Sequence, residues 1–119
     1  MDNIIEAVII EPGGEVRVEQ LQRGCEPLQR LVGGWIEAVY SDTADLTFWI
    51  NEEGKLIGLE PNMLGTACWL GTNVDANDTL CGTVVITGGV DNEGETLTIP
   101  ADLRDKLLTA LNAVNAVDL

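Results

Sequence analysis

Acidic side chains are the main candidates for chemistry, because the chain contains no histidine and only three cysteines. Without histidine, the Ser-His and Cys-His pairs of nucleophilic catalysis and most catalytic zinc sites are excluded. Cys68 and Cys81 lie in apolar segments, which predicts buried packing residues. Cys25 precedes a predicted helix whose dipole could lower its pKa, but no base accompanies it. We therefore expect structural roles for all three thiols.

Carboxylates could still act in general acid–base catalysis or bind a metal. Glu52-Glu53 is a pair of neighbouring acids at a predicted turn, where carboxylates are normally solvated, so we do not expect catalysis there. Four further acids follow at spacings similar to those of an EF-hand calcium loop: Asp91, Glu93, Glu95 and Asp102. The glycine that such a loop requires is replaced by Thr96, and strand and turn patterns flank it instead of helices. We predict no catalytic residue and no metal site.

Three glycine pairs could in principle belong to phosphate-binding loops. They are Gly13-Gly14, Gly33-Gly34 and Gly88-Gly89. None has the lysine of a P-loop or the glycine spacing of a dinucleotide-binding fingerprint. We interpret them as turn glycines and predict no cofactor.

The tryptophans are more suggestive of binding. Alternation along residues 46–50 places Trp49 on the face opposite Phe48. If the face with Phe48 is buried, Trp49 is left on the surface together with Trp35, and exposed tryptophan is enriched at binding sites. In the alternative, the sheet is covered on both faces and both tryptophans are buried. The binding residues that we predict are Trp35, Glu37, Trp49, Glu52 and Glu53.

The chain is strongly acidic, with 20 acidic and 6 basic residues and a net charge of -14. The acids occur in every segment in runs of at most two, which excludes a disordered acidic tail. Nucleic acids and anionic membranes need clustered Lys and Arg, and the six here are scattered. We therefore expect no direct nucleic-acid or membrane binding. The acidity indicates a self-repelling, soluble surface, with mimicry of a polyanion such as DNA as the sharper alternative.

The N-terminal sequence MDNIIEAVII is acidic and its apolar run is short, which argues against a secretory signal. No apolar stretch approaches the length of a membrane span. An odd number of cysteines without CxxC spacing is typical of reduced thiols. We expect a cytoplasmic protein.

The elements that must position these residues alternate between strand and helix patterns. Strands are expected at residues 3–10, 16–19, 35–40, 46–50, 55–59 and 80–87, with a further short one at 96–99. The first two should form a hairpin around Glu11-Pro12-Gly13-Gly14. Residues 51–55 should form a tight turn with Gly54 at positive φ, so that residues 55–59 return beside 46–50. Polar connections are expected at residues 41–43 and 72–78.

Three helices complete the expected fold. One begins at Pro27 and ends at Gly33-Gly34, and a second begins at Pro61 with Leu64 and Cys68 on one face. The last begins at Pro100, runs to about residue 114, and should cover one face of the sheet. Its apolar stripe is Leu103, Leu107, Leu111 and Val114. We predict one α+β domain over residues 1–119, with a mostly antiparallel sheet of about five to seven strands.

One block combines several of these patterns: LQ-LVGG-(aromatic)-IE-V from residue 28, NEEGKL-GL-PN from residue 51, and a G-T-VV-I-G strand from residue 82. In this combination the chain resembles a small domain-of-unknown-function family that is common in phages and mobile elements. The resemblance covers most of the chain and implies a phage or plasmid accessory protein, with no established activity or catalytic residue to carry over. Glu60, where a proline or small residue is usual, and the loop 71–78 depart from it.

We therefore expect a non-enzymatic binding protein that acts on a host protein in the host cytoplasm. The alternative is a small-molecule binder for a nucleotide or signalling metabolite, in which a tryptophan stacks on the base and an arginine binds phosphate. The candidate side chains for that role are Trp35, Trp49 and Trp69 with Arg17, Arg23 and Arg30. A DNA-mimic inhibitor and an enzyme that uses carboxylates alone rank below these two.

Overall fold

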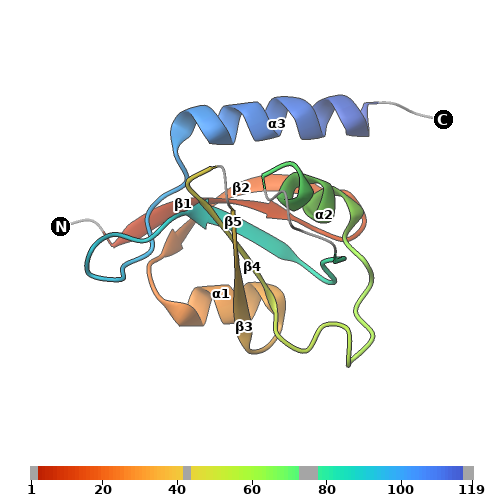
Figure 1. Ribbon diagram of the computed structural model, residues 1–119, viewed down its shortest axis with the longest axis horizontal. Helices are drawn as coiled ribbons and strands as arrows, with labels where there is room; N and C mark the ends of the chain where they lie inside the picture. The colour runs from red at the N-terminus through yellow and green to blue at the C-terminus, as the bar shows by residue number, and fades with distance from the viewer. Residues whose placement is uncertain (1–2, 42–43, 73–77, 117–119) are drawn as a thin grey trace.

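The computed structural model describes residues 3–41, 44–72 and 78–116, which form an antiparallel sheet with helices on both faces (Figure 1). The strands lie in the order β2-β1-β5-β4-β3. They are β1 (Ile4–Ile10), β2 (Val16–Gln22), β3 (Ile36–Tyr40), β4 (Leu46–Asn51) and β5 (Val84–Gly88). The helices are α1 (Cys25–Val32), α2 (Met63–Leu70) and α3 (Ala101–Asn115). The predicted α+β class, antiparallel sheet and C-terminal helix are confirmed.

The β1–β2 hairpin follows the sequence pattern closely. Its register runs from Ile4 opposite Gln22 to Ile10 opposite Val16. The connecting turn is closed by the Gly14 amide, which donates to the Glu11 carbonyl at 2.9 Å. β-Branched residues in β1 fit a buried pleated surface, and β1 is central because β5 pairs with its other edge.

The sheet separates two apolar clusters. On one face, Phe48 and Ile86 pack under α2 and α3, and Leu111 is the buried anchor of α3. On the other face, Ile9 and Val85 pack against α1. Trp49 is partly buried in this second cluster. For Trp49, the alternative in which the sheet is covered on both faces is therefore confirmed. Val114 was predicted to complete the buried stripe of α3 but is 55% exposed, so this prediction is wrong at the last turn of the helix.

Helix α1 starts at Cys25, two residues before the predicted start at Pro27. Proline is tolerated throughout the first turn, where amides lack intrahelical acceptors, so it marks the turn and not its first residue. The predicted end is confirmed: Gly33 has a φ of 81° and its amide donates to the Gln29 carbonyl.

The predicted hairpin around residues 51–55 is wrong. Residues 52–58 form successive turns, in which the Ile57 amide donates to the Glu53 carbonyl at 3.0 Å and the Leu59 amide to the Gly54 carbonyl at 2.9 Å. The residue at positive φ is Gly58, with a φ of 76°, and not Gly54. The physical reason is that β3 and β5 already occupy both edges of β4, so a returning strand has no backbone groups to pair with.

Three further boundaries differ from the predictions. Pro61 forms an isolated bridge with Cys81, and α2 begins after it at Met63. Strand β5 begins at Val84 instead of residue 80. Residues 96–99 form only one isolated bridge, between Thr96 and Val90. Residues 42–43 of one predicted connection and 73–77 of the other lie outside the described residues.

Candidate functional site

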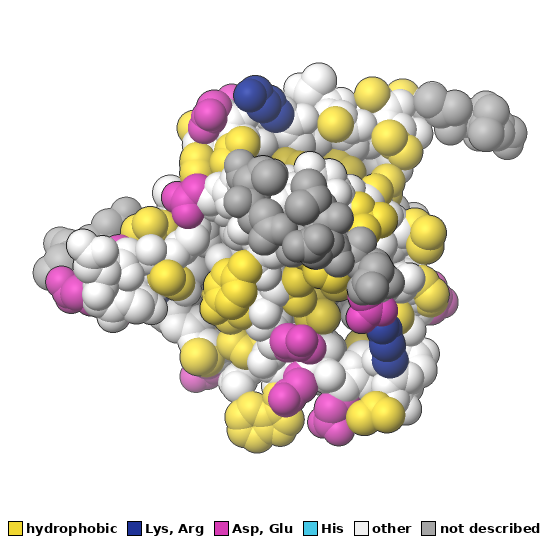
Figure 2. Space-filling view, in the orientation of Figure 1, with side chains coloured by type: hydrophobic (Ala, Val, Ile, Leu, Met, Phe, Trp, Pro, Cys, Tyr) yellow, Lys and Arg dark blue, Asp and Glu magenta, His cyan; other side chains and the backbone are white. Residues whose placement is uncertain are grey.

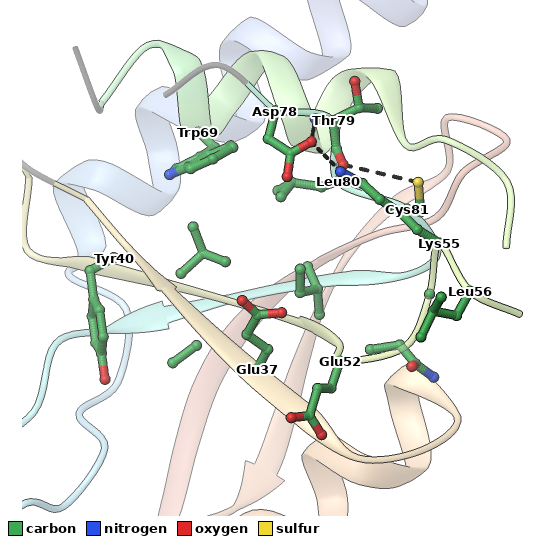
Figure 3. Close-up of a pocket in the computed structure, with 15 residues that line it drawn as sticks. Glu37, Tyr40, Glu52, Lys55, Leu56, Trp69, Asp78, Thr79, Leu80 and Cys81 are labelled. Atoms are coloured by element: carbon green, nitrogen blue, oxygen red, sulfur yellow. Dashed lines mark hydrogen bonds and ion pairs between the residues drawn. The ribbon is translucent and has the colours of Figure 1, made fainter. Parts of the chain in front are cut away.

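A cavity of about 490 Å³ lies beside the edge strand β3 (Figure 3). Its walls come from β3, the end of β4, the turns that follow β4, helix α2 and the segment 78–81. The lining includes four consecutive β3 residues, Glu37 to Tyr40, so the cavity runs along the backbone of this strand. In the close-up, Glu37 lies centrally, Glu52 at the lower edge, and Trp69 and Asp78 along the top.

The cavity combines apolar walls with acidic groups. Val39, Ile50 and Leu80 contribute apolar surface. Glu37 and Glu52 also line it, and neither carboxylate has a hydrogen bond or ion pair among the described residues. Figure 2 shows this mixture on the lower part of the face, where acidic side chains lie among hydrophobic ones and basic side chains are sparse.

The basic group lining the cavity, Lys55, is already engaged. Its ammonium forms an ion pair with Asp78, which also accepts a hydrogen bond from the Thr79 amide at 2.8 Å. The hydrogen bond from Lys55, followed by that from Thr79, lowers the pKa of Asp78. Asp78 and Lys55 therefore neutralise each other, and Glu37 and Glu52 are the carboxylates of the cavity that have no ion pair with any described residue.

Local structure explains how these two acids are presented. Strand alternation places Glu37 opposite Ile50 and Val39 opposite Phe48, on the face that carries α2. Glu52 is held by Asn51, which is 5% exposed. The Asn51 side chain donates to the Val32 carbonyl at 3.1 Å and accepts from the Glu53 amide at 2.8 Å. This pair of bonds joins the end of α1 to the turn and orients the Glu52 backbone.

The opposite wall depends on Asn62, which is fully buried. Its side-chain oxygen caps α2 by accepting from the Gly65 amide at 2.9 Å, and its backbone amide donates to the Leu80 carbonyl at 2.8 Å. The Leu80 amide in turn donates to the Thr66 hydroxyl at 2.9 Å. Asn62 and Thr66 thereby fix Leu80 against α2. Trp69 from the same helix is 9% exposed, and its Nε1–H has no hydrogen-bond partner within the described ranges.

Of the five predicted binding residues, the cavity brings two together, Glu37 and Glu52. Trp35 is 67% exposed, but only its carbonyl is tied to this region, through the Glu52 amide at 2.8 Å. Trp49 faces the α1 side, where its Nε1–H donates to the Thr87 hydroxyl at 2.9 Å. Glu53 is exposed and does not line the cavity.

Sequence reasoning did not place Trp69 or the Lys55–Asp78 pair at this site. Trp69 entered only as one of three possible stacking residues, because nothing in a short apolar helix indicates which side chain meets a distant strand. The Lys55–Asp78 pair joins residues far apart in the chain. The strand pattern around Val39 and Ile50 was the signal that could have located the floor of the cavity.

The remaining candidates for chemistry lie in different surroundings, and the predicted burial of Cys81 is wrong, because this residue is half-buried and lines the cavity. Burial raises the pKa of the Cys68 thiol to about 11, while Cys25 is exposed. Asp91 accepts hydrogen bonds from the Glu95 and Glu93 amides, which lower its pKa, so its carboxylate organises the turn that resembled a calcium loop. Within residues 3–41, 44–72 and 78–116, no group of three or more potential metal ligands comes together.

Comparisons with known proteins place the chain in a family context. Residues 5–112 match the family described as "Domain of unknown function (DUF3846)". No curated protein and no solved structure matches the chain significantly. Over the described residues, no helix combines the length and the apolar character that crossing a membrane requires.

Proposed function

The chain belongs to the DUF3846 family, and we propose that it is a non-enzymatic binding domain that occupies a basic segment of a partner protein. The observation that carries this proposal is that Glu37 and Glu52, which have no hydrogen bond or ion pair within the described ranges, lie beside the apolar walls of the cavity.

The chemistry of the cavity fits a Lys or Arg side chain. These side chains have an apolar stem that packs on surfaces such as Val39 and Leu80, and a cationic end that pairs with carboxylates. A carboxylate that is unpaired in the free protein gains a charge-assisted hydrogen bond on binding, without losing an internal partner. The net charge of -14 would also attract a basic partner over a distance and raise the association rate.

The resemblance to phage and mobile-element proteins supports a more specific form of this proposal. In that form, the chain is an accessory protein that acts in the host cytoplasm by occupying a host protein. A partner with a functional basic surface, which would otherwise bind a polyanion, would be blocked by such an acidic domain.

The small-molecule alternative has less support from the cavity. A nucleotide or phosphorylated metabolite needs a free cation beside a stacking surface. Lys55 is paired with Asp78, Arg17 with Glu11, and Arg30 with Glu26. The third candidate arginine, Arg23, has a buried Nε without a hydrogen-bond partner in the described part of the chain, but it does not line the cavity. The uncompensated charges of the cavity are negative and would repel phosphate.

Quantitative affinity capture from host lysate at low salt tests the proposal. The immobilised wild-type chain should retain a stoichiometric partner, which moderate salt releases. The Glu37→Gln/Glu52→Gln variant should retain it at least about tenfold less. A matched control, Glu15→Gln/Glu93→Gln, removes the same charge from exposed sites away from the cavity and should bind like wild type. Equal retention by both double variants, or no retained partner, would contradict the proposal.

A further inference from the structure

Among residues 3–41, 44–72 and 78–116, strand β3 is an open edge of the sheet, because it pairs with β4 on one side and ends the strand order. Two hydrogen bonds show which of its residues direct their backbone N–H and C=O groups away from β4. The Glu52 amide donates to the Trp35 carbonyl at 2.8 Å, and the Ser41 amide donates to the Leu46 carbonyl at 3.3 Å. In an antiparallel ladder such pairs recur every second residue, so Glu37 and Val39 bond to β4. The backbone N–H and C=O groups of Ile36 and Ala38 therefore point away from the sheet, toward the open edge.

The two edges of the sheet differ in their protection. Charged residues protect the β2 edge against pairing with another strand: Arg17 on β2 forms ion pairs with Glu11 and Glu19. Strand β3 has the sequence IEAVY, with no proline, no lysine and no arginine, and its pairing with β4 is regular without a bulge. Natural sheets normally use such devices to prevent pairing at an edge. Along β3, proline, lysine, arginine and a bulge are absent, and the one charged side chain is Glu37, which disfavours an acidic strand and favours a basic one.

The cavity lies where the side chains of an added strand would be placed. Successive side chains of a strand alternate between the two faces of the sheet. A strand paired with β3 would therefore direct every second side chain to the face of Glu37 and Val39, which is the face of the cavity. The side chains at these positions of the added strand would contact both the carboxylates and the apolar walls of the cavity.

We propose that β3 is the docking edge for an extended segment of the partner protein, whose alternate side chains are Lys or Arg and enter the cavity. This inference rests on the proposed function and specifies how the basic segment is held. The backbone of the segment pairs with Ile36 and Ala38, and its basic side chains pair with Glu37 and Glu52.

The charge of the chain favours a basic segment over a second copy, and the Trp69 indole offers a hydrogen-bond donor to whichever strand binds. A second copy also carries a charge of -14, and pairing two β3 strands would bring two sets of unpaired carboxylates together. The indole of Trp69 is 9% exposed, lines the cavity and has an unused Nε1–H donor within the described ranges. In Figure 3 its ring nitrogen is drawn at the end of the indole on the Tyr40 side of the view. A bound segment could supply the missing acceptor.

The test uses a blocked peptide of alternating Arg and Val as the probe. Two peptides serve as controls: one with Glu in place of Arg, and one with the same side chains but N-methylated at every valine, so that its backbone cannot pair with the outward groups of β3. Binding is measured by titration calorimetry, and exchange of the Ile36 and Ala38 amides is followed by NMR. On the protein, Ala38→Pro removes an outward N–H and obstructs the edge, while Ala38→Val retains the donor and serves as its control.

The proposal expects the Arg peptide to bind and to slow exchange of the Ile36 and Ala38 amides. N-methylation and Ala38→Pro should each weaken binding at least about tenfold, whereas Ala38→Val should not. Because the N-methylated peptide needs no protein variant, the test holds even if Ala38→Pro unfolds the domain.

Each other outcome overturns strand addition in a distinguishable way. Equal affinity for the N-methylated peptide, with loss of binding in Glu37→Gln/Glu52→Gln, would refute pairing at β3 but leave the proposed function standing. No binding of the Arg peptide, with capture from lysate that depends on Glu37 and Glu52, would also refute only the strand addition. Failure of both peptide binding and capture would refute both proposals. A dimer whose interface protects the Ile36 and Ala38 amides would assign the edge to a second copy.

Discussion

Replacement of Asn62 by alanine should be among the most damaging substitutions in the chain. The Asn62 amide nitrogen donates to the Ile10 carbonyl at 2.8 Å and to the Gly82 carbonyl at 2.9 Å, and its oxygen caps α2. The side chain is fully buried, so water cannot replace these bonds. One residue thus joins the end of β1, the start of α2 and the segment before β5.

The magnitude follows from the groups that lose a partner. Loss of the cap costs about 1 kcal/mol. The Ile10 and Gly82 carbonyls would each be left unsatisfied at about 1–3 kcal/mol. We expect Asn62→Ala to lower the free energy of unfolding by about 3–7 kcal/mol, which is a large part of the roughly 5–15 kcal/mol typical of a domain.

Asn62→Asp separates the roles of the two side-chain atoms. A carboxylate can still cap α2, but it cannot donate to the two carbonyls and places a negative charge against them. Burial and these carbonyls should raise its pKa in the folded state above the unfolded value of about 3.9. The loss of stability should therefore be greatest near neutral pH and diminish as pH falls through the raised pKa toward the unfolded one, since protonation removes the charge and restores one donor.

Urea denaturation followed by circular dichroism measures both effects. The control is Asn115→Ala, which also removes an asparagine side chain that donates to a carbonyl, that of Gly14 at 2.8 Å, but at an exposed site. Because water can replace that bond, we expect a cost below about 0.5 kcal/mol. A cost for Asn62→Ala below about 1 kcal/mol, or equal costs for the two asparagines, would refute the reasoning.

Three further predictions concern other parts of the structure. Gly65→Ala should destabilise the fold in thermal denaturation although alanine favours helices, because a Cβ there would lie 2.7 Å from a methyl carbon of β5; an unchanged or higher melting temperature would contradict the close packing. In native protein at pH 8, iodoacetamide should modify exposed Cys25 well before Cys68, whose pKa burial raises to about 11, as peptide mass spectrometry would show; equal rates would indicate that α2 opens readily. The Thr83 hydrogen bond lowers the pKa of Glu11 below its usual 4.5, so this carboxylate contributes stability above that value and loses it as pH falls through the lowered pKa. Glu11→Gln should therefore cost on the order of 1 kcal/mol at neutral pH, with a difference from wild type that disappears in acid; a constant difference would exclude this carboxylate as its source.

Prediction from the sequence succeeded where neighbouring residues decide the structure. The β1–β2 hairpin and α3 follow from alternation, a turn and an apolar stripe, all within one segment. It failed at residues 52–58, because a tight turn and successive turns share the same residue types. The choice depends on whether β4 has a free edge, and β5, which occupies that edge, comes much later in the chain.

The candidate site divides in the same way. The acidity of the chain and the absence of histidine chemistry are properties of composition. Glu37 and Glu52 were predicted as binding residues, but Trp49 was placed with them although it lies on the other face of the sheet. The alternating pattern predicts that two residues lie on opposite faces of the sheet, but it does not predict which face a distant helix will cover.

The sequence by itself determined an acidic α+β chain, the type of most elements and the exclusion of histidine-dependent catalysis. Only the tertiary structure decided that β3 is an edge and that Trp69 and Leu80 meet it across a cavity. It also decided that Asp78 neutralises Lys55 while Glu37 and Glu52 have no such partner in the part of the chain that the structure describes. The physical reason is that turns and periodicity arise from neighbouring residues, whereas strand edges, cavities and ion pairs arise from contacts between distant ones.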